Sequence, residues 1–170
     1  MSFKVIDPLE FKGNPFRTMQ EGVLVTSRAG DTINTMTVGW GGFGCFWGRQ
    51  VVFMAVRPER YTFQLLEQAD NFSVSLMPGD KGMAEIVEFL GTVSGRDRDK
   101  IRESGLTLVQ EEGVPCFKEA ETVFICKKLA NPPIHEQDIL PGHQIVETWY
   151  GGGFHHLFIG EILRVLVSPC

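Results

Sequence analysis

The sequence predicts a mainly β (α+β) fold, a mostly antiparallel barrel decorated by short helices. Three observations support this prediction. The 170-residue chain is 43% apolar and 22% charged, the balance of a globular protein that buries a core. Several short runs carry β-branched or alternating apolar side chains, whereas only three short segments have helical spacing. Strands and helices do not alternate regularly, which excludes a doubly wound parallel sheet. The length of the chain and the absence of a polar linker favour one domain spanning residues 1–170.

The expected strands follow from β-branched runs and from the turns that separate them. Residues 22–28 and 34–40 form a hairpin, because the turn-forming Ala29-Gly30-Asp31 lies between them. Gly160 inside the last strand is expected to mark a bulge. The other predicted strands cover residues 51–57, 72–77, 122–128, 144–149 and 155–167.

Three short helices are expected. The first covers residues 60–69, after Pro58, with an apolar stripe that includes Phe63 and Leu66. The second begins at the capping residue Asp80 and runs to Leu90, where Gly91 stops it. The third spans residues 97–103 and is closed by Gly105.

Charge and composition exclude several classes of function. A net charge of −5 argues against nucleic-acid binding, which needs clustered cations. There is no apolar run long enough for a membrane span, and the first residues lack a signal-peptide pattern, so we expect a cytoplasmic protein with no membrane partner. The four cysteines, Cys45, Cys116, Cys126 and Cys170, have no metal-ligand spacing and are expected to be reduced thiols, with no metal site.

Residues 39–53 are unusually rich in glycine and aromatic residues. Gly39 to Gly44 spells GxGxxG, but the dinucleotide motif needs a following helix, and a β-like run follows instead. A flexible loop is the alternative, with bare backbone that a flat ligand can approach. Trp40 then suits stacking against a planar heterocycle such as isoalloxazine, nicotinamide or pyridoxal. The competing interpretation is that Trp40, Phe43, Phe46 and Trp47 fill the core or a dimer interface.

Two clusters of cations and hydroxyls are suited to a phosphate group. Residues 57–62, RPERYT, lie where a strand gives way to a helix, so guanidinium groups, a hydroxyl and helix-start N–H groups come together. Residues 92–100 repeat this pattern with Ser94, Arg96 and Lys100 before another short helix. For the second cluster, acidic neighbours can instead neutralise the cations on a solvated helix face.

The order of several segments resembles the flavin reductase-like family, and within it the flavoredoxins. The resemblance spans roughly residues 15–167 and ends on a His five residues before a Gly in the last strand. The segments that carry it are Val23 to Thr26, Asn34 to Trp40, Val56 to Thr62, Asn71 to Val74 and Phe154 to Ile162.

This resemblance implies a split antiparallel β-barrel of the FMN-binding type that works as a homodimer. Asn34, Thr35, Met36 and Thr37 would follow the edge of the isoalloxazine ring, and Trp40 would lie against it. Arg60, Thr62 and Lys100, together with Arg57 and Ser94, would address the phosphate. Phe154 and His155 would lie at the cofactor, with His155 as the catalytic residue; His156 should point to the opposite side of the strand. Phe154 stands where many members have Asp, so His155 lacks a carboxylate partner.

The implied activity is that of an FMN-dependent oxidoreductase. It would pass electrons from NAD(P)H or a redox-protein donor to a small acceptor or to free flavin. Two alternatives use the same fold: a non-catalytic FMN electron carrier, and a binding module for haem or another planar ligand.

Overall fold

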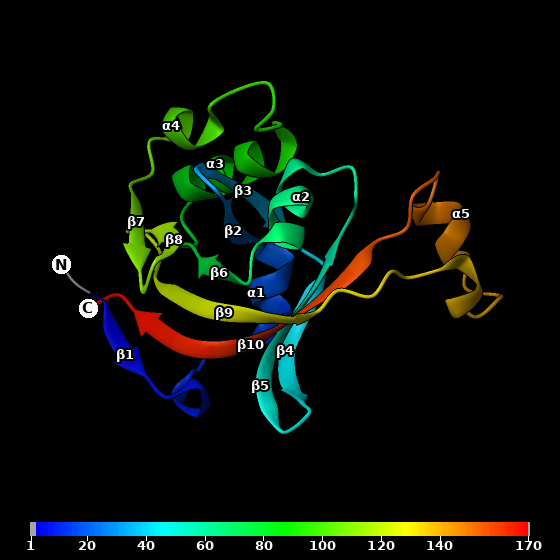
Figure 1. Ribbon diagram of the computed structural model, residues 1–170, viewed down its shortest axis with the longest axis horizontal. Coiled ribbons are helices and arrows are strands. Elements are labelled where there is room, and N and C mark those ends of the chain that lie inside the picture. The colour runs from blue at the N-terminus through cyan, green and yellow to red at the C-terminus, as the bar shows by residue number, and fades with distance from the viewer. Residues whose placement is uncertain (1–2, 170) are drawn as a thin grey trace.

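The computed structural model describes residues 3–169, and its centre is one curved antiparallel sheet (Figure 1). The strand order is β3-β2-β6-β9-β10-β5-β4, and β1 pairs with the far end of β10. A separate hairpin is formed by β7 and β8. The strands are β1 (Lys4–Ile6), β2 (Val23–Ala29), β3 (Thr32–Val38), β4 (Gly41–Phe46), β5 (Arg49–Val56), β6 (Asn71–Leu76), β7 (Leu108–Glu111), β8 (Val114–Phe117), β9 (Thr122–Ala130) and β10 (His156–Val167).

The sheet curls into a split barrel, as the sequence predicts, with β3 and β4 as its unclosed edges. Alternate residues of the strands point inward and form one buried cluster, which includes Val25, Met54, Phe72, Phe124 and Phe158. The pairing of β10 with β9 shifts register between Ile159 and Gly160, which confirms the predicted bulge.

Short helices lie around the barrel. They are α1 (Pro15–Glu21), α2 (Tyr61–Gln68), α3 (Lys81–Thr92), α4 (Lys100–Ser104) and α5 (Ile145–Trp149), with 3-10 turns at Pro8–Glu10 and Glu136–Asp138. α2 confirms the helix predicted over residues 60–69. The carboxylate of Asp80 accepts from Met83 N at 3.0 Å and caps α3, as expected. α4 begins at Lys100, because Asp99 is its cap, and Gly105 in the left-handed conformation closes it.

Gly91 does not stop α3; it lies inside the helix, which ends at Thr92. A Cβ atom at this position would come within 2.9 Å of Cβ of Thr37 on β3. Glycine is therefore required here by the close approach of α3 to β3 and not by a helix end.

The strand predicted over residues 144–149 is wrong. Gln144 has a positive φ of 52°, and α5 follows it, with the N–H of Tyr150 donating to the carbonyl of Val146. A few β-branched and aromatic residues over so short a run do not distinguish a strand from one helical turn. The segment between β9 and β10 leaves the barrel altogether and projects as an arm that carries α5 (Figure 1).

Residues 39–53 form a hairpin and not a flexible loop. β4 pairs with β5 through a two-residue turn in which Trp47 and Gly48 both have positive φ, the geometry that matches strand twist. Phe43 packs against the barrel core. Phe46 and Trp47 are exposed at the tip of the hairpin and therefore do not belong to the core.

Three cysteines are free thiols: Cys45 is exposed, and Cys116 and Cys126 are buried. Burial raises the pKa of Cys116 to about 12, so this thiol is inert at neutral pH. Cys170 lies outside the described residues. Over residues 3–169, none of the helices has the length and apolar character that crossing a membrane requires.

Candidate functional site

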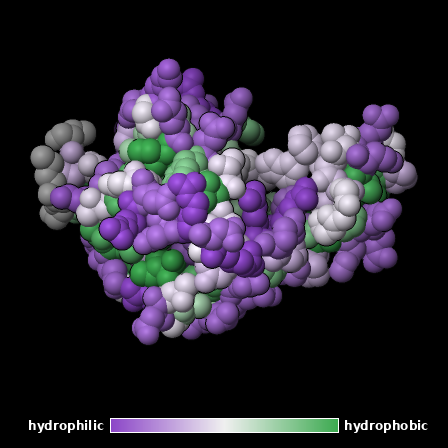
Figure 2. Space-filling view, turned by 90° about the horizontal axis from the view of Figure 1, so that it is seen from above, coloured by the Kyte–Doolittle hydropathy of each residue, from purple (hydrophilic) through white to green (hydrophobic). Residues whose placement is uncertain are grey.

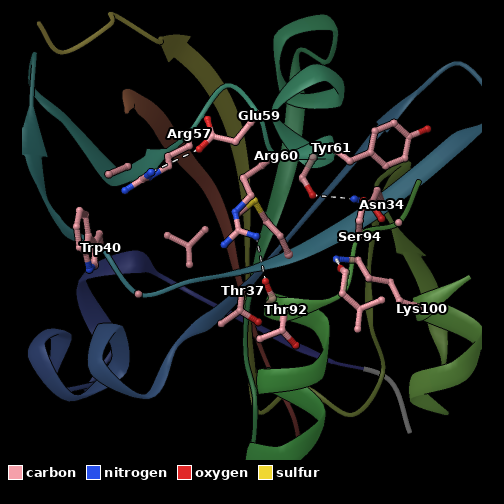
Figure 3. A pocket seen from close by; sticks show the side chains of 18 of the residues that line it. Asn34, Thr37, Trp40, Arg57, Glu59, Arg60, Tyr61, Thr92, Ser94 and Lys100 are labelled. Carbon is pink, nitrogen blue, oxygen red and sulfur yellow. Dashed lines mark hydrogen bonds and ion pairs between the residues drawn. The ribbon is translucent and has the colours of Figure 1, made fainter. Parts of the chain in front are cut away.

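A cavity of about 590 Å³ opens at the unclosed edge formed by β3, between the start of α2 and the end of α3 (Figure 3). These helices cover opposite faces of the sheet here. Phe63 and Leu66 of α2 join the barrel core, whereas Val87 and Leu90 of α3 pack with Leu24 on the outer face. The lining residues include every predicted site residue except Thr35 and Phe154: Asn34, Met36, Thr37, Trp40, Arg57, Arg60, Thr62, Ser94, Lys100 and His155.

Side chains of β3 tie both helices to the sheet edge. The amide Nδ2 of Asn34 donates to Oγ1 of Thr62 in the first turn of α2, at 2.8 Å. On the other face, the hydroxyl of Thr37 donates to the carbonyl of Val87 in α3. Because successive side chains of a strand point to opposite faces, Asn34 contacts α2 and Thr37 contacts α3. These contacts hold the two walls of the cavity against β3.

Thr35 does not reach the cavity with its side chain, contrary to the prediction. It is fully buried, and its hydroxyl bonds to Oγ1 of Thr26 at 3.0 Å and to the carbonyl of Val25 at 3.1 Å. Both partners belong to β2, so this side chain joins the two strands and is not available to a ligand.

Gly95 lets the loop after α3 press against β3. A Cβ atom on Gly95 would lie 2.2 Å from Oδ1 of Asn34, which is too close for two non-bonded atoms. The neighbouring Ser94 thereby reaches the cavity. Gly95 thus shapes the wall that carries the second predicted cation cluster.

The cavity is strongly cationic, although the chain as a whole is acidic. Arg57, Arg60, Arg96 and Lys100 all line it, and among the described residues of the lining Glu59 is the one carboxylate. The chain carries a net charge of −5, so this concentration of positive charge is local. Guanidinium and ammonium groups gathered in a concave site attract an anion such as a phosphate.

Each cation is held in place by backbone carbonyls. Nη1 of Arg60 lies 3.3 Å from the carbonyl of Gly91, and Nη1 of Arg96 lies 3.1 Å from that of Glu59. The Nζ of Lys100 donates to the carbonyls of Leu90 and Val93, at 2.7 and 2.9 Å. Because Lys100 is buried and lies near Arg60, its pKa is lowered to about 8.

The start of α2 also faces this cavity. Arg60 is the residue before its first turn, and no side chain caps the helix N-terminus. Uncapped N–H groups and the positive end of the helix dipole favour an anion at this position.

Trp40 lies at the opposite end of the cavity from Ser94 and Lys100 (Figure 3), together with two further aromatic rings. The rings of Trp40 and His155 lie 4.9 Å apart, and Trp149 meets Trp40 edge-on at 5.1 Å. Arg57 also lies at this end, where its Nη2 donates to the carbonyl of Trp149 at 2.6 Å and its Nη1 pairs with Glu59 at 3.5 Å. The base of the arm is therefore attached to the barrel beside the cavity.

His155 is 7% exposed and lines the cavity from the start of the last strand. Burial lowers its pKa; Arg57 and Arg60 lower it further, and Glu59 opposes them. The imidazole is therefore neutral at neutral pH. His156 points elsewhere, as expected: its Nδ1 lies 3.0 Å from the carbonyl of Asn131, and its ring meets Phe63.

Phe154 does not line the cavity, contrary to the prediction. Its ring stacks on Tyr150, with centroids 4.4 Å apart and planes 22° apart. The hydroxyl of Tyr150 in turn lies 3.1 Å from Nδ1 of His155. The histidine that lacks a neighbouring Asp thus has a tyrosine partner. Neither Tyr150 nor Trp149 was predicted as a site residue, because Trp149 was assigned to a strand and the path of the loop after it determines where Tyr150 lies.

Comparison with known proteins identifies the family. The split barrel with a cavity at its open edge defines the class of fold, and a model of the flavin reductase like domain matches residues 16–170. The chain therefore belongs to the flavin reductase-like family.

Solved structures agree on the fold. The chain is similar to the flavoredoxin of Desulfovibrio vulgaris (Miyazaki F), with 23% identity, a TM-score of 0.68, and coverage of 96% of this chain and 76% of that one. An FMN-binding domain of a flavin reductases-like enzyme from Shewanella baltica OS155 gives 17% identity, a TM-score of 0.68 and coverage of 97% and 76%. An NADH:FAD oxidoreductase of Streptomyces globisporus C-1027, in complex with NAD and FAD fragments, has 19% identity and a TM-score of 0.61, and the match covers 88% of this chain and 75% of that one. The fold is the split barrel of FMN-binding flavin reductase-like proteins.

One curated relative is an uncharacterized protein of Aeropyrum pernix. It is 34% identical over 134 residues, which make up 74% of this chain and 43% of that protein. The chain thus spans less than half the length of this relative.

Proposed function

We propose that the cavity binds FMN and that the protein is an oxidoreductase of the flavin reductase and flavoredoxin type, with residues 1–170 as one FMN-binding domain. One observation carries the proposal: a single cavity joins a cationic end, beside a helix N-terminus, to an aromatic end beside a neutral histidine. FMN has the matching shape, with a phosphate at one end and a flat ring system at the other.

The cationic end is suited to the phosphate. Arg60 lies at the centre of the cavity, with Ser94 and Lys100 beyond it (Figure 3), and Thr62 stands in the first turn of α2. Two of the three donors of Lys100 are engaged with carbonyls, so one remains for a phosphate oxygen. Arg57 lies at the aromatic end instead, and we assign it to the ring side of the ligand.

The aromatic end is suited to the isoalloxazine ring. Met36 and Thr37 line the cavity along the β3 edge, where polar groups of the strand can pair with the rim of a flavin. Asn34 lies beside Ser94 and Lys100 instead (Figure 3), so we assign its side chain to the phosphate side of the ligand. Trp40 offers a ring surface for stacking and also contacts Trp149 and His155.

Bound FMN would supply the hydride and single-electron chemistry. The chain contributes cations that neutralise the phosphate, an aromatic wall that orients the ring, and His155 as an uncharged hydrogen-bonding group beside it. The likeness to an NADH:FAD oxidoreductase supports NAD(P)H as electron donor, with a small molecule or free flavin as acceptor. A redox-protein partner remains the alternative donor.

A homodimer is part of the proposal. The arm that carries α5 stands away from the body of the molecule, and Figure 2 shows apolar patches on it. Leu140, Ile145 and Trp149 of the arm are exposed apolar side chains, which a second copy would cover. Light scattering of the purified chain tests this. We further propose a cytoplasmic location, in keeping with the three free thiols.

Two measurements test the function. The first is the absorption spectrum of the purified chain before and after FMN is added, and we expect flavin maxima that remain with the protein on gel filtration. A protein that takes up no FMN contradicts the proposal, and a Soret band would indicate a haem-binding module. The second is steady-state NAD(P)H oxidation with excess flavin: a rate above that of free FMN indicates a reductase, whereas an equal rate indicates an electron carrier.

A further inference from the structure

Tyr150 does not line the cavity, and its hydroxyl meets Nδ1 of His155, which does. The distance from this hydroxyl to Nδ1 is 3.1 Å. The Tyr150 ring is fixed by its stack on Phe154, and the guanidinium of Arg57 lies 5.8 Å from its centroid. The tyrosine is thus held in one orientation by neighbours on both its own loop and the barrel.

The protein groups around the Tyr150 hydroxyl favour one direction of this hydrogen bond. A phenol carries one proton, and among residues 3–169 the Tyr150 hydroxyl has no hydrogen-bond partner besides His155. If Nδ1 carried the histidine proton, the phenol proton would have no protein acceptor. If Nδ1 is bare, the hydroxyl donates to it and both groups are satisfied.

The surroundings keep the ring uncharged, so the choice lies between two neutral tautomers. The groups around His155 are Arg57 and Glu59 from the end of β5 and the turn after it, Arg60 before α2, and Tyr150 after α5. Burial, together with the two arginines, outweighs the single carboxylate and lowers the pKa of His155. A neutral imidazole has one donor and one acceptor nitrogen, and the partner of one nitrogen decides the role of the other.

We propose that Tyr150 is a positioning residue that donates to Nδ1 of His155 and so fixes the proton on Nε2, the nitrogen left for a ligand in the cavity. The inference rests on the proposed function, in which His155 faces the flavin or the incoming substrate. It adds a selectivity to that site: at His155 the ligand must present an acceptor, such as a carbonyl or carboxylate oxygen or an unprotonated ring nitrogen. A ligand that presents a donor there would be disfavoured.

His156 provides an internal contrast. Its Nδ1 lies 3.0 Å from the carbonyl oxygen of Asn131, which can only accept. The neutral His156 ring therefore carries its proton on Nδ1. Two consecutive histidines are expected to have opposite tautomers, each set by the partner of the same ring atom.

The test is nitrogen NMR of the 170-residue chain labelled with ¹⁵N, with and without FMN, above the pH at which the histidines are charged. In the wild type we expect a bare Nδ1 and a protonated Nε2 for His155, and the reverse for His156. Tyr150→Phe keeps the ring and its stack but removes the donor. In this variant we expect the Nδ1 signal of His155 to move and its protonation midpoint to rise, because the neutral ring has lost a stabilising bond, while His156 stays unchanged.

Either of two outcomes overturns the proposal: a protonated Nδ1 on His155 in the wild type, or a Tyr150→Phe variant whose His155 signals and midpoint equal those of the wild type. The wild-type spectrum decides the tautomer even if the variant does not fold. The FMN-free sample keeps the two claims apart. Failure to bind FMN refutes the proposed function and leaves the tautomer measurable, whereas FMN binding with the wrong tautomer refutes only the role of Tyr150.

Discussion

The Nζ of Lys100 lies 2.7 Å from the carbonyl oxygen of Leu90, so the first residue of α4 closes the last turn of α3. The same ammonium donates to Val93 in the loop that follows. Lys100 therefore holds together the wall of the cavity that also carries Ser94 and Gly95. A residue predicted to bind phosphate is at the same time part of the structure that shapes the site.

The burial of Lys100 makes stability depend on pH. Its pKa is about 8 in the folded chain, compared with 10.5 for a lysine exposed to solvent in the unfolded chain. At pH values between 8 and 10.5, the unfolded chain therefore binds more protons than the folded chain. Stability contributed by Lys100 therefore rises as pH increases from 8 to 10.5. We expect the unfolding free energy of the wild type, relative to Lys100→Met, to increase by roughly 1–2 kcal/mol between pH 8 and 10.

Urea unfolding of both proteins at several pH values measures this difference. The comparison with Lys100→Met removes the contributions of all other titrating groups. A difference that stays constant or falls over this range would show that the Lys100 pKa is not lowered by folding.

Gly95→Ala is expected to disrupt the cavity. Its Cβ would lie 2.2 Å from Oδ1 of Asn34, so the loop or the Asn34 side chain must move, and the bond from Asn34 to Thr62 is strained or lost. We expect FMN affinity to fall at least tenfold, the equivalent of about 1.4 kcal/mol, as measured by fluorescence quenching of the flavin.

Gly79→Ala is the matched control. Gly79 is exposed, is not among the glycines with a positive φ, and has no atom within 4 Å of the added Cβ. This variant should bind FMN like the wild type. Equal affinity in the Gly95 variant would mean that the loop against Asn34 does not form part of the binding site.

Trp40→Leu tests the aromatic end. Trp40 is 40% exposed and contacts both Trp149 and His155, so its loss should leave the barrel folded but remove the ring face offered to a ligand. We expect a changed absorption spectrum of bound FMN and an affinity lower by about 0.5–1.5 kcal/mol. Wild-type spectrum and affinity would assign Trp40 to packing alone.

Much of the barrel could be predicted because its signals are local. The β-branched run before Ala29-Gly30-Asp31 and the cap at Asp80 specify a hairpin and a helix start without reference to the rest of the chain. α5 could not be predicted, because five residues give too few turns for periodicity to show. The hairpin of β7 and β8 was also missed, although Glu112 and Gly113, both with positive φ, form its turn.

For the candidate site, residue types and order were predictable, but the partners of each side chain were not. The sequence indicated cations near two helix starts, and both clusters line one cavity. It could not show that Thr35 bonds to β2 or that Tyr150 reaches His155, because these contacts depend on strand register and on the path of the arm. Gly91 and Gly95 show the same limit: their need for glycine arises from β3, which is distant in sequence.

The most direct test of the central claim is a paired titration of the chain with FMN and with riboflavin, which lacks the phosphate. We predict that the wild type binds FMN more tightly than riboflavin. Arg60→Ala should weaken FMN binding by about 1.5–3 kcal/mol and leave riboflavin binding nearly unchanged, while Arg17→Ala, an exposed position on α1, should alter neither. A wild type that binds neither flavin, or equal losses for both flavins in Arg60→Ala, would contradict a phosphate site at the start of α2.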